Sequence, residues 1–304
     1  MIFKINILGC GSATPTLRRN PTAQVINILE RHFLIDCAEG TQLQMRKYGI
    51  KFQKINHIFI SHLHGDHYLG LIGFLSTLHL LGRTKEIHVY GPEALGEIIF
   101  SQLKASQSFL SYHIEFHPLT SKECELIYED DKVTIETIPL KHRIYCNGFL
   151  LKEKQHEYRI NIEAVNEHKV PIAWFHRLKK GENYIDENKT IPVEELTFPP
   201  YSSRSYAYCS DTAYLESIIP IIKGAHLLYH EATFLNDQKK RAKQTLHSTV
   251  EDACNIAKQS EVKKLLIGHY SARYKSTEAF IEEALPIFKN TEAVEDGDEF
   301  TIAL

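Results

Sequence analysis

The chain has 304 residues, 43% of them hydrophobic, enough for one large α/β unit or two smaller domains. Its 35 Lys and Arg residues are outnumbered by 38 Asp and Glu residues, which excludes a protein that coats nucleic acid with its whole surface but allows a local basic patch. We expect no membrane association, because no apolar run approaches the ~18 residues of a spanning helix and no signal peptide is recognisable. The six cysteines form no Cys-x-x-Cys pair, which indicates reduced thiols in a cytoplasmic protein.

The N-terminal region begins with alternating apolar and polar residues at 2–9, which predict a β-strand. We interpret Gly9-Cys10-Gly11-Ser12 as a plain turn, since the third glycine and the Gly-Lys-Ser/Thr ending of phosphate-binding loops are missing. In the polar loop 12–20, Arg19 and Asn20 are candidates for phosphate or base contacts, and a solvated loop is the alternative. A hairpin with strands at 25–29 and 32–35 is predicted next, followed by a short helix at 41–48.

A histidine-rich turn at residues 61–70 places four potential metal ligands within six positions: His62, His64, Asp66 and His67. A buried strand is predicted before it at 57–60 and a helix after it at 68–81. In an extended chain His62 and His64 point the same way, and Gly65 then lets the chain fold back. The turn can therefore serve two neighbouring metal ions, and an exposed polar turn is the alternative.

The segment after this helix is predicted to contain a strand at 86–90, a helix that Gly91-Pro92 opens and that runs to 104, and a meander of strands. The meander strands are expected at 113–117, 123–128 and 133–139. His142 follows the last of them, where a metal ligand is expected.

Residues 152–200 differ in composition and predict an insertion that projects from the core. They contain the only tryptophan, Trp174, within a basic and aromatic stretch at 170–181. We expect this stretch to contact RNA through Arg177, Lys179 and Lys180. Packing of the stretch on a dimer partner or on the body of the protein is the alternative.

In the C-terminal third, three predicted strands are each followed by an acidic residue or a histidine. The strands and the residues that follow them are 205–209 before Asp211, 226–229 before Glu231 and 263–267 before His269. Ser248 is predicted to cap a helix running to 259, with Glu251 completing a capping box. A basic helix at 236–243, a helix at 276–289 and a final strand complete the prediction.

Together these residues make a plausible dinuclear metal site. Three imidazoles and a carboxylate suit one Zn²⁺, and an Asp, two His and a shared carboxylate suit a second. Asp211 is the natural bridge, because its carboxylate offers two oxygens. Such a pair of ions activates water and hydrolyses phosphate esters or amides, and the metal ligands alone do not decide which.

The turn resembles the His-x-His-x-Asp-His motif of the metallo-β-lactamase superfamily, and the full set of motifs resembles the ribonuclease Z family of tRNA 3′ endonucleases. The resemblance runs from Gly9 to about Tyr274. Besides the turn, the matching motifs are Pro15-Thr16 with Arg19-Asn20, Pro139-Leu140-Lys141-His142-Arg143, Ser210-Asp211-Thr212, His230-Glu231-Ala232-Thr233, His247-Ser248-Thr249 and His269-Tyr270-Ser271-Ala272-Arg273-Tyr274.

The resemblance implies a single αββα sandwich over residues 1–304, with a flexible arm at 152–200 that binds tRNA. Its implied zinc ligands are His62, His64 and His142 for one ion, Asp66, His67 and His269 for the other, and Asp211 for both. Asp66 would orient or deprotonate the attacking water, and the Glu231–His247 pair would protonate the leaving 3′ oxygen. Arg273 and the Arg19–Asn20 loop would lie near the scissile phosphate.

The resemblance also implies a homodimer, in which the arm of one subunit assists the other, and precursor tRNA as the substrate. The arm departs from the family pattern, because no Gly-Pro pair precedes Lys179-Lys180-Gly181. Two alternatives stay open: a phosphodiesterase acting on small phosphodiesters, and a non-catalytic RNA-binding paralogue.

Overall fold

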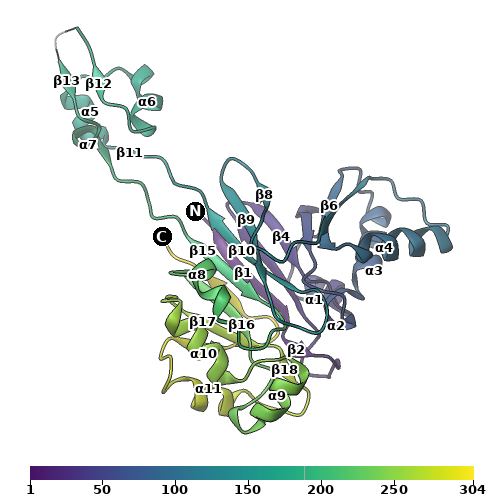
Figure 1. Cartoon of the computed structure of the whole chain (residues 1–304). Coiled ribbons are helices and arrows are strands. Elements are labelled where there is room, and N and C mark those ends of the chain that lie inside the picture. The colour runs from purple at the N-terminus through teal and green to yellow at the C-terminus, as the bar shows by residue number, and fades with distance from the viewer. Residues whose placement is uncertain (188) are drawn as a thin grey trace.

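The protein, seen here as a computed structural model, is described for residues 1–187 and 189–304. Within these residues two seven-stranded sheets pack face to face, with helices on the outer surfaces (Figure 1). In pairing order the first sheet contains β20 (Glu299–Thr301), β1 (Phe3–Gly9), β3 (Ala23–Ile28), β4 (Arg31–Ile35), β5 (Ile55–Phe59), β6 (Ile87–Pro92) and β7 (Ile114–Leu119). The second contains β19 (Thr291–Ala293), β17 (Leu265–Gly268), β16 (Leu227–Glu231), β15 (Ser205–Cys209), β10 (Asn147–Glu153), β9 (Val133–Pro139) and β8 (Leu126–Glu129). The predicted αββα sandwich is confirmed.

Two predictions about the strands were wrong. Gly91 and Pro92 do not open a helix but continue β6, where they pair with Pro118 and Leu119 of β7. The predicted meander is wrong for its first strand, because β7 pairs in parallel with β6 in the first sheet, whereas β8 and β9 pair antiparallel in the second as expected. The chain therefore crosses from one sheet to the other between β7 and β8.

The main core lies between the sheets, where the aromatic rings of Phe59 from β5 and Phe149 from β10 are 5.4 Å apart. The sheets are also joined by a buried hydrogen bond, which the Tyr208 hydroxyl on β15 donates to Asp36 over 2.7 Å. A second core lies between the first sheet and three helices: α1 (Thr41–Lys47), α3 (Leu71–Leu80) and α4 (Ala94–Ala105). Hydrophobic burial on both faces explains why the central strands read as apolar runs.

The outer face of the second sheet carries α10 (Val250–Gln259), which contacts β16, β17 and α11 (Glu278–Ala284). The capping box of α10 is one residue later than predicted, since Thr249 rather than Ser248 caps the helix and Asp252 rather than Glu251 completes the box. The shorter helical segments are α8 (Ile219–Ile222), α9 (Lys239–Thr245), η1 (Phe52–Lys54), η3 (Glu216–Ile218) and η4 (Asn236–Gln238). None of the helices in the described part of the chain is long and apolar enough to cross a lipid bilayer.

The helix predicted after the histidine turn is broken into α2 (Gly65–Tyr68) and α3. At the break, a Cβ atom on Gly70 would lie 2.0 Å from the carbonyl oxygen of Ala38, so only glycine allows this close approach. The Gly70 amide donates a hydrogen bond to the Cys37 carbonyl over 2.9 Å. The break therefore packs the histidine turn against the segment that follows β4.

The segment between β10 and β15 extends away from both sheets (Figure 1). Its short elements are β11 (Arg159–Ile160), α5 (Ile162–Glu167), η2 (Ile172–Trp174), α6 (Phe175–Lys179), β12 (Tyr184–Ile185), β13 (Thr190–Ile191), α7 (Val193–Leu196) and β14 (Thr197–Phe198). We call this segment the arm. It has a small hydrophobic cluster of its own, which includes Val165, Leu178 and Leu196.

Candidate metal centre

The predicted metal ligands converge at one edge of the sandwich. Strands β15, β16 and β17 are parallel, so their carboxyl ends meet at the same edge and present Asp211, Glu231 and His269 together. The loop after β9, which belongs to the same sheet, ends at this edge as well, and the histidine turn after β5 brings ligands from the first sheet. Beside these segments, a two-stranded sheet formed by β2 (Gly11–Ser12) and β18 (Tyr270–Ser271) joins the N-terminal half of the chain to the C-terminal half.

The first ligand set consists of His62, His64, His142 and Asp211. The Nδ1 atom of His64 lies 3.1 Å from Nε2 of His62 and 3.1 Å from Nε2 of His142. Oδ2 of Asp211 lies 3.4 Å and 3.8 Å from the same two Nε2 atoms. Three imidazole nitrogens and one carboxylate oxygen thus face a common point, as tetrahedral zinc sites require.

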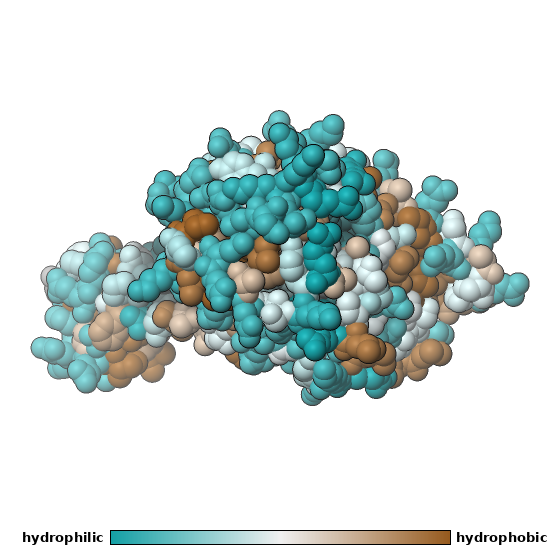
Figure 2. Space-filling view, turned by 90° about the horizontal axis from the view of Figure 1, so that it is seen from below, coloured by the Kyte–Doolittle hydropathy of each residue, from teal (hydrophilic) through white to brown (hydrophobic). Residues whose placement is uncertain are grey.

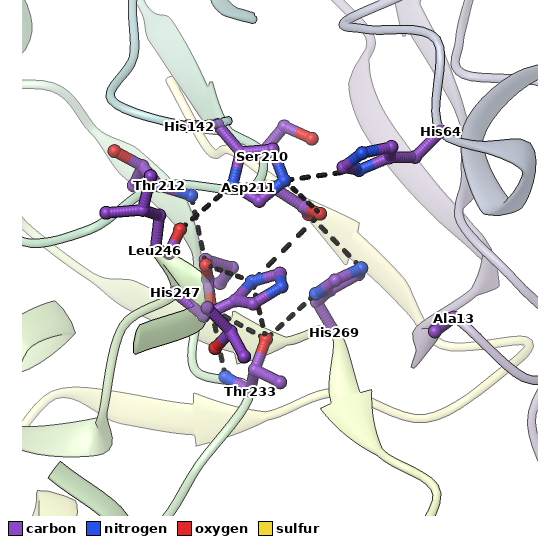
Figure 3. Close-up of polar contacts among 12 residues, drawn as sticks. Ala13, His64, His142, Ser210, Asp211, Thr212, Thr233, Leu246, His247 and His269 are labelled. Carbon is purple, nitrogen blue, oxygen red and sulfur yellow. Dashed lines mark hydrogen bonds and ion pairs between the residues drawn. The ribbon is translucent and has the colours of Figure 1, made fainter. Parts of the chain in front are cut away.

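The second ligand set consists of Asp66, His67 and His269, and the other oxygen of Asp211 faces it. Oδ1 of Asp211 is 3.4 Å from Nε2 of His67 and 3.2 Å from Nε2 of His269. Oδ2 of Asp66 lies 3.7 Å and 3.4 Å from these nitrogens. Asp211 therefore turns one oxygen to each set, the arrangement expected of a bridging ligand (Figure 3).

The chemistry of these side chains fits bound metal ions. Nε2 of His67, Nε2 of His269 and Oδ1 of Asp211 are buried and have no hydrogen-bond partner among the described residues. Buried polar atoms normally have partners, and these three are nitrogen and oxygen atoms of the kinds that ligate zinc. Burial alone would raise the pKa of Asp211, but the neighbouring histidines hold it well below its usual value. Its carboxylate is thus ionised, as a ligand must be.

Partners outside the ligand sets set the tautomers of four histidines. Nδ1 of His67 donates to Asp36 over 2.8 Å, and Nδ1 of His142 donates to the Leu246 carbonyl over 2.9 Å. For the other two histidines the partner of Nδ1 is a hydroxyl group, that of Ser61 for His62 and that of Thr233 for His269. Each of these hydroxyls already donates to a carboxylate, so it accepts from the imidazole. Every Nε2 atom is thereby left with a free lone pair.

The backbone around the centre is strained at several non-glycine residues. Positive φ angles occur at Ala13 (57°), Asp36 (54°), Leu246 (56°) and His269 (60°). Such conformations cost about 1–3 kcal/mol each and persist where the surrounding structure enforces them. Each of these residues supplies a ligand or a direct contact to one, since the Ala13 amide donates to Asp66 over 2.6 Å.

His247 and Glu231 form a second functional unit beside the two ligand sets. Nδ1 of His247 lies 2.8 Å from Oε1 of Glu231, which is fully buried. Glu231 also accepts from the amides of Thr212 and Thr233, each over 3.0 Å, so its carboxylate is fixed. Burial would lower the pKa of His247, but the Glu231 and Asp211 carboxylates raise it to about 9. A histidine that carries a proton at neutral pH suits a general acid.

A cavity of about 480 Å³ opens over the centre. Asp66, Asp211 and His247 line it together with two arginines, Arg143 and Arg241. Neither arginine was predicted as a substrate contact. The signals in the sequence were the basic character of 236–243 and the position of Arg143 directly after His142.

Arg19 and Asn20, which we expected to contact RNA, have hydrogen-bond partners in the C-terminal segment. Arg19 is 5% exposed, and its guanidinium donates two hydrogen bonds to Glu295, over 2.8 Å and 2.7 Å. The side chain of Asn20 donates to Asp296 over 2.9 Å. These residues hold the 12–20 loop to the C-terminal segment, and Ser12, Ala13 and Pro15 of the same loop line the cavity.

The other predicted substrate contacts lie at the surface. Arg273, four residues after His269, is exposed and donates to the side chain of Gln238 over 3.0 Å, and it does not line the cavity. The arm residues Arg177, Lys179 and Lys180 are exposed, but they do not line the cavity. Arg177 stacks on Trp174, with its guanidinium carbon 4.0 Å from the ring centroid.

Comparisons with known proteins agree with this geometry. Residues 3–168 match the family model described as anti-Pycsar protein Apyc1. The ribonuclease Z of Bacteroides thetaiotaomicron is 48% identical over 290 residues, covering 95% of this chain and 92% of that protein. The ribonuclease Z of Cytophaga hutchinsonii is 46% identical over 305 residues, covering 100% of this chain and 97% of that protein. The human tRNase Z, short form, has a TM-score of 0.74 at 26% identity, covering 99% of this chain and 100% of that one.

The metallo-β-lactamase fold protein YhfI from Bacillus subtilis is similar in fold, with a TM-score of 0.71 at 18% identity. The Apyc1 match ends before Asp211, His247 and His269, whereas the ribonuclease Z relatives cover both halves of the site. Residues 3–168 therefore belong to the family that the Apyc1 model describes. The whole chain has a metallo-β-lactamase fold and belongs to the ribonuclease Z family.

Proposed function

We propose that this chain is a zinc-dependent endoribonuclease that removes 3′ trailers from tRNA precursors and leaves a 3′-hydroxyl on the tRNA. The observation that carries the proposal is Asp211, whose two oxygens face separate ligand sets beside the His247–Glu231 pair. The ribonuclease Z and tRNase Z relatives support the tRNA substrate.

Two ions per subunit are proposed. His62, His64 and His142 would hold one, Asp66, His67 and His269 the other, and Asp211 both. Such ions supply a nucleophilic hydroxide at neutral pH and stabilise the charge on the attacked phosphate. Asp66 is held by the Ala13 amide, and nearby histidines lower its pKa although burial would raise it. As an ionised acceptor lining the cavity, Asp66 orients the attacking water.

His247 would protonate the 3′ oxygen that leaves with the tRNA. Its Nδ1 atom is bonded to Glu231, so Nε2 is the nitrogen available to the substrate. The Glu231 carboxylate fixes the ring and favours its protonated form. The pair therefore delivers a proton to the leaving oxygen, the task of a general acid.

Substrate binding is proposed to use two regions. Arg143 and Arg241 line the cavity and would contact phosphates near the cut. The exposed Arg273, four residues after His269, would do the same. Arm residues Arg177, Lys179 and Lys180 would bind the body of the tRNA. Because the arm extends away from its own active site (Figure 1), we propose a cytoplasmic homodimer in which it assists the partner's site.

A phosphodiesterase of small phosphodiesters is the second candidate, since the cavity and both ligand sets would serve any phosphodiester. A non-catalytic RNA-binding paralogue is the third. The presence of His247 and Glu231 beside both ligand sets favours catalysis over binding alone, and the arm favours a macromolecular substrate.

The deciding experiment is cleavage of a trailer-bearing tRNA precursor, with and without a chelator, beside an Asp66→Ala variant and a small phosphodiester. We expect a single cut near the discriminator nucleotide, lost with the chelator and in the variant. Rapid turnover of the small diester with an intact precursor would support the second candidate. Binding of the precursor without either cleavage would support the third.

A further inference from the structure

A second cavity, of about 610 Å³, lies next to the catalytic one. Its walls are mainly apolar and come from four segments, three at the ends of β5, β6 and β7 and one between β9 and β10: Leu63, Pro92, Ala94, Leu119, Ile144 and Tyr145. The polar wall residues are His64, Glu93 and Thr120. Cavities of ~300–1,000 Å³ with such walls are typical ligand sites. We call it the edge pocket. Apart from His64, none of the proposed metal ligands, the general acid or the arginines lines it.

The edge pocket adjoins the catalytic cavity, because His64 lines both. A third cavity, of about 440 Å³, shares His142 and Arg143 with the catalytic cavity, and Ile144 and Tyr145 with the edge pocket. Lys122 also lines this third cavity. A strand of RNA leaving the centre on this side therefore meets two cationic side chains beside an apolar pocket.

The walls of the edge pocket suit a nucleobase. The Tyr145 hydroxyl donates to the Ser121 carbonyl and accepts from the Asn147 side chain, each over 2.8 Å, so the ring is held in place. Ile144 is 39% exposed although it is apolar. Figure 2, which views the molecule from below Figure 1, shows brown hydrophobic patches among the hydrophilic surface of both the arm and the body. Bases bind such platforms by stacking, with little sequence preference.

The direction of the RNA follows from the proposed role of His247. This residue protonates the 3′ oxygen of the tRNA, so the 3′ end of the tRNA lies in the part of the cavity that His247, Arg241 and Thr245 line. In Figure 3 His64 and His247 approach the Asp211 carboxylate from different sides. The trailer, which keeps the phosphate, then continues past His64 to the edge pocket.

We infer that the edge pocket binds a nucleobase of the single-stranded trailer, within the first nucleotides after the cut, while Arg143 and Lys122 contact the trailer phosphates. This inference rests on the proposed tRNA-processing function. It adds a binding subsite for the part of the substrate that is removed.

The test combines a change in the protein with a change in the RNA. Precursors carry either a normal trailer or a trailer in which one of the first three nucleotides lacks its base. Each is cleaved by the wild type, by Ile144→Ser, and by Ile2→Ser as a control at another exposed isoleucine. For the wild type we expect removal of one base to lower kcat/KM about tenfold, as for lost stacking, and exchange of that base to change it little.

In Ile144→Ser the abasic penalty should shrink to about threefold or less, whereas Ile2→Ser should keep the full penalty. A general structural defect would lower the rate on both RNAs equally, so only the change in the ratio supports the pocket. Equal rates on normal and abasic trailers in the wild type, or the same ratio in Ile144→Ser, would overturn the inference while leaving the proposed function intact. A wild type that cleaves no precursor would overturn both.

Discussion

The metal centre and the arm are built in opposite ways. At the centre nearly every polar side chain is buried and hydrogen-bonded, so that Asp36 alone accepts from Ser61, His67 and Tyr208. The arm has a small core of its own and presents exposed cations such as Lys179 and Lys180 to solvent. The metal centre holds its side chains in fixed positions, whereas the arm presents positive charge on a segment that projects from the body.

This difference matches two different tasks. Chemistry at a phosphate depends on placing a few atoms closely, which buried networks with fixed tautomers achieve. Attraction of a large polyanion depends on the number of cations more than on their exact positions. Changes at the centre should therefore abolish turnover, whereas changes in the arm should weaken the binding of long RNA alone.

The largest effect is expected for Asp211→Ala, which removes the carboxylate shared by the two ligand sets. We expect precursor cleavage to fall about a thousandfold or more, and the metal content to fall from about two ions per chain to one or none. Activity and metal analysis on the same preparation measure both quantities. Asp237→Ala, at an exposed aspartate, is the control. Retention of both ions in Asp211→Ala would contradict the bridging role.

A smaller loss is expected for His247→Ala. Removal of a general acid lowers kcat by about 10²–10³-fold while the metal ligands stay in place. Single-turnover cleavage and metal analysis separate these two outcomes. His113→Ala, at an exposed histidine, is the matched control. Loss of metal in His247→Ala would show that this residue acts as a ligand instead.

The base of the arm gives a prediction about stability. Glu153 and Arg204 form a buried ion pair there, with 2.5 Å between Oε1 and Nη2. Burial would raise the pKa of Glu153, but hydrogen bonds from Arg204 lower it below its usual value. The pair thus stabilises the fold fully above the unfolded-state pKa of about 4.3, and this contribution is lost as the pH falls through the lower folded-state value.

Glu153→Gln should therefore lower the free energy of unfolding by about 3 kcal/mol at pH 7, because it leaves Arg204 buried without a charged partner. The difference from the wild type should shrink at pH 3–4. Urea unfolding at both pH values measures this, with Glu157→Gln as the exposed control. A difference that is constant with pH would exclude the charge as its origin.

The smallest effect is expected in the arm. Replacing both Lys179 and Lys180 by alanine should raise KM for the precursor about tenfold and make cleavage less dependent on salt, because up to two phosphate contacts are lost. Turnover of a small diester should not change. The control replaces Lys258 and Lys289, two exposed lysines on the body. Equal losses on the two substrates would remove the arm from substrate binding.

Much of the centre could be predicted from the sequence, because its ligands stand in a compact turn or directly after strands. The residues that orient them could not be predicted in this way. Asp36 and Thr233 act through contacts with residues distant in sequence, and Leu246 acts through a backbone carbonyl. The ion pair of Arg19 could not be predicted for the same reason, since its partner Glu295 lies 276 positions away.

The errors in the fold have similar causes. The alternation of apolar and polar residues identified β7 and β8 as strands, but this pattern carries no information about the sheet in which each strand pairs. Gly91 and Pro92 were read as a helix start from local preference, although pairing with β7 keeps them extended. The shift of the cap from Ser248 to Thr249 is a local choice between two good capping residues. Ser248 instead donates its hydroxyl hydrogen to the Thr212 carbonyl over 2.7 Å, beside Asp211.

The most direct test of the account is anomalous diffraction at the zinc edge from crystals of the zinc-loaded protein. The account predicts two peaks per chain, one among His62, His64 and His142 and one among Asp66, His67 and His269, with an oxygen of Asp211 next to each. A single peak, or two peaks of which one lies away from Asp211, would contradict the claim that this carboxylate joins two metal sites.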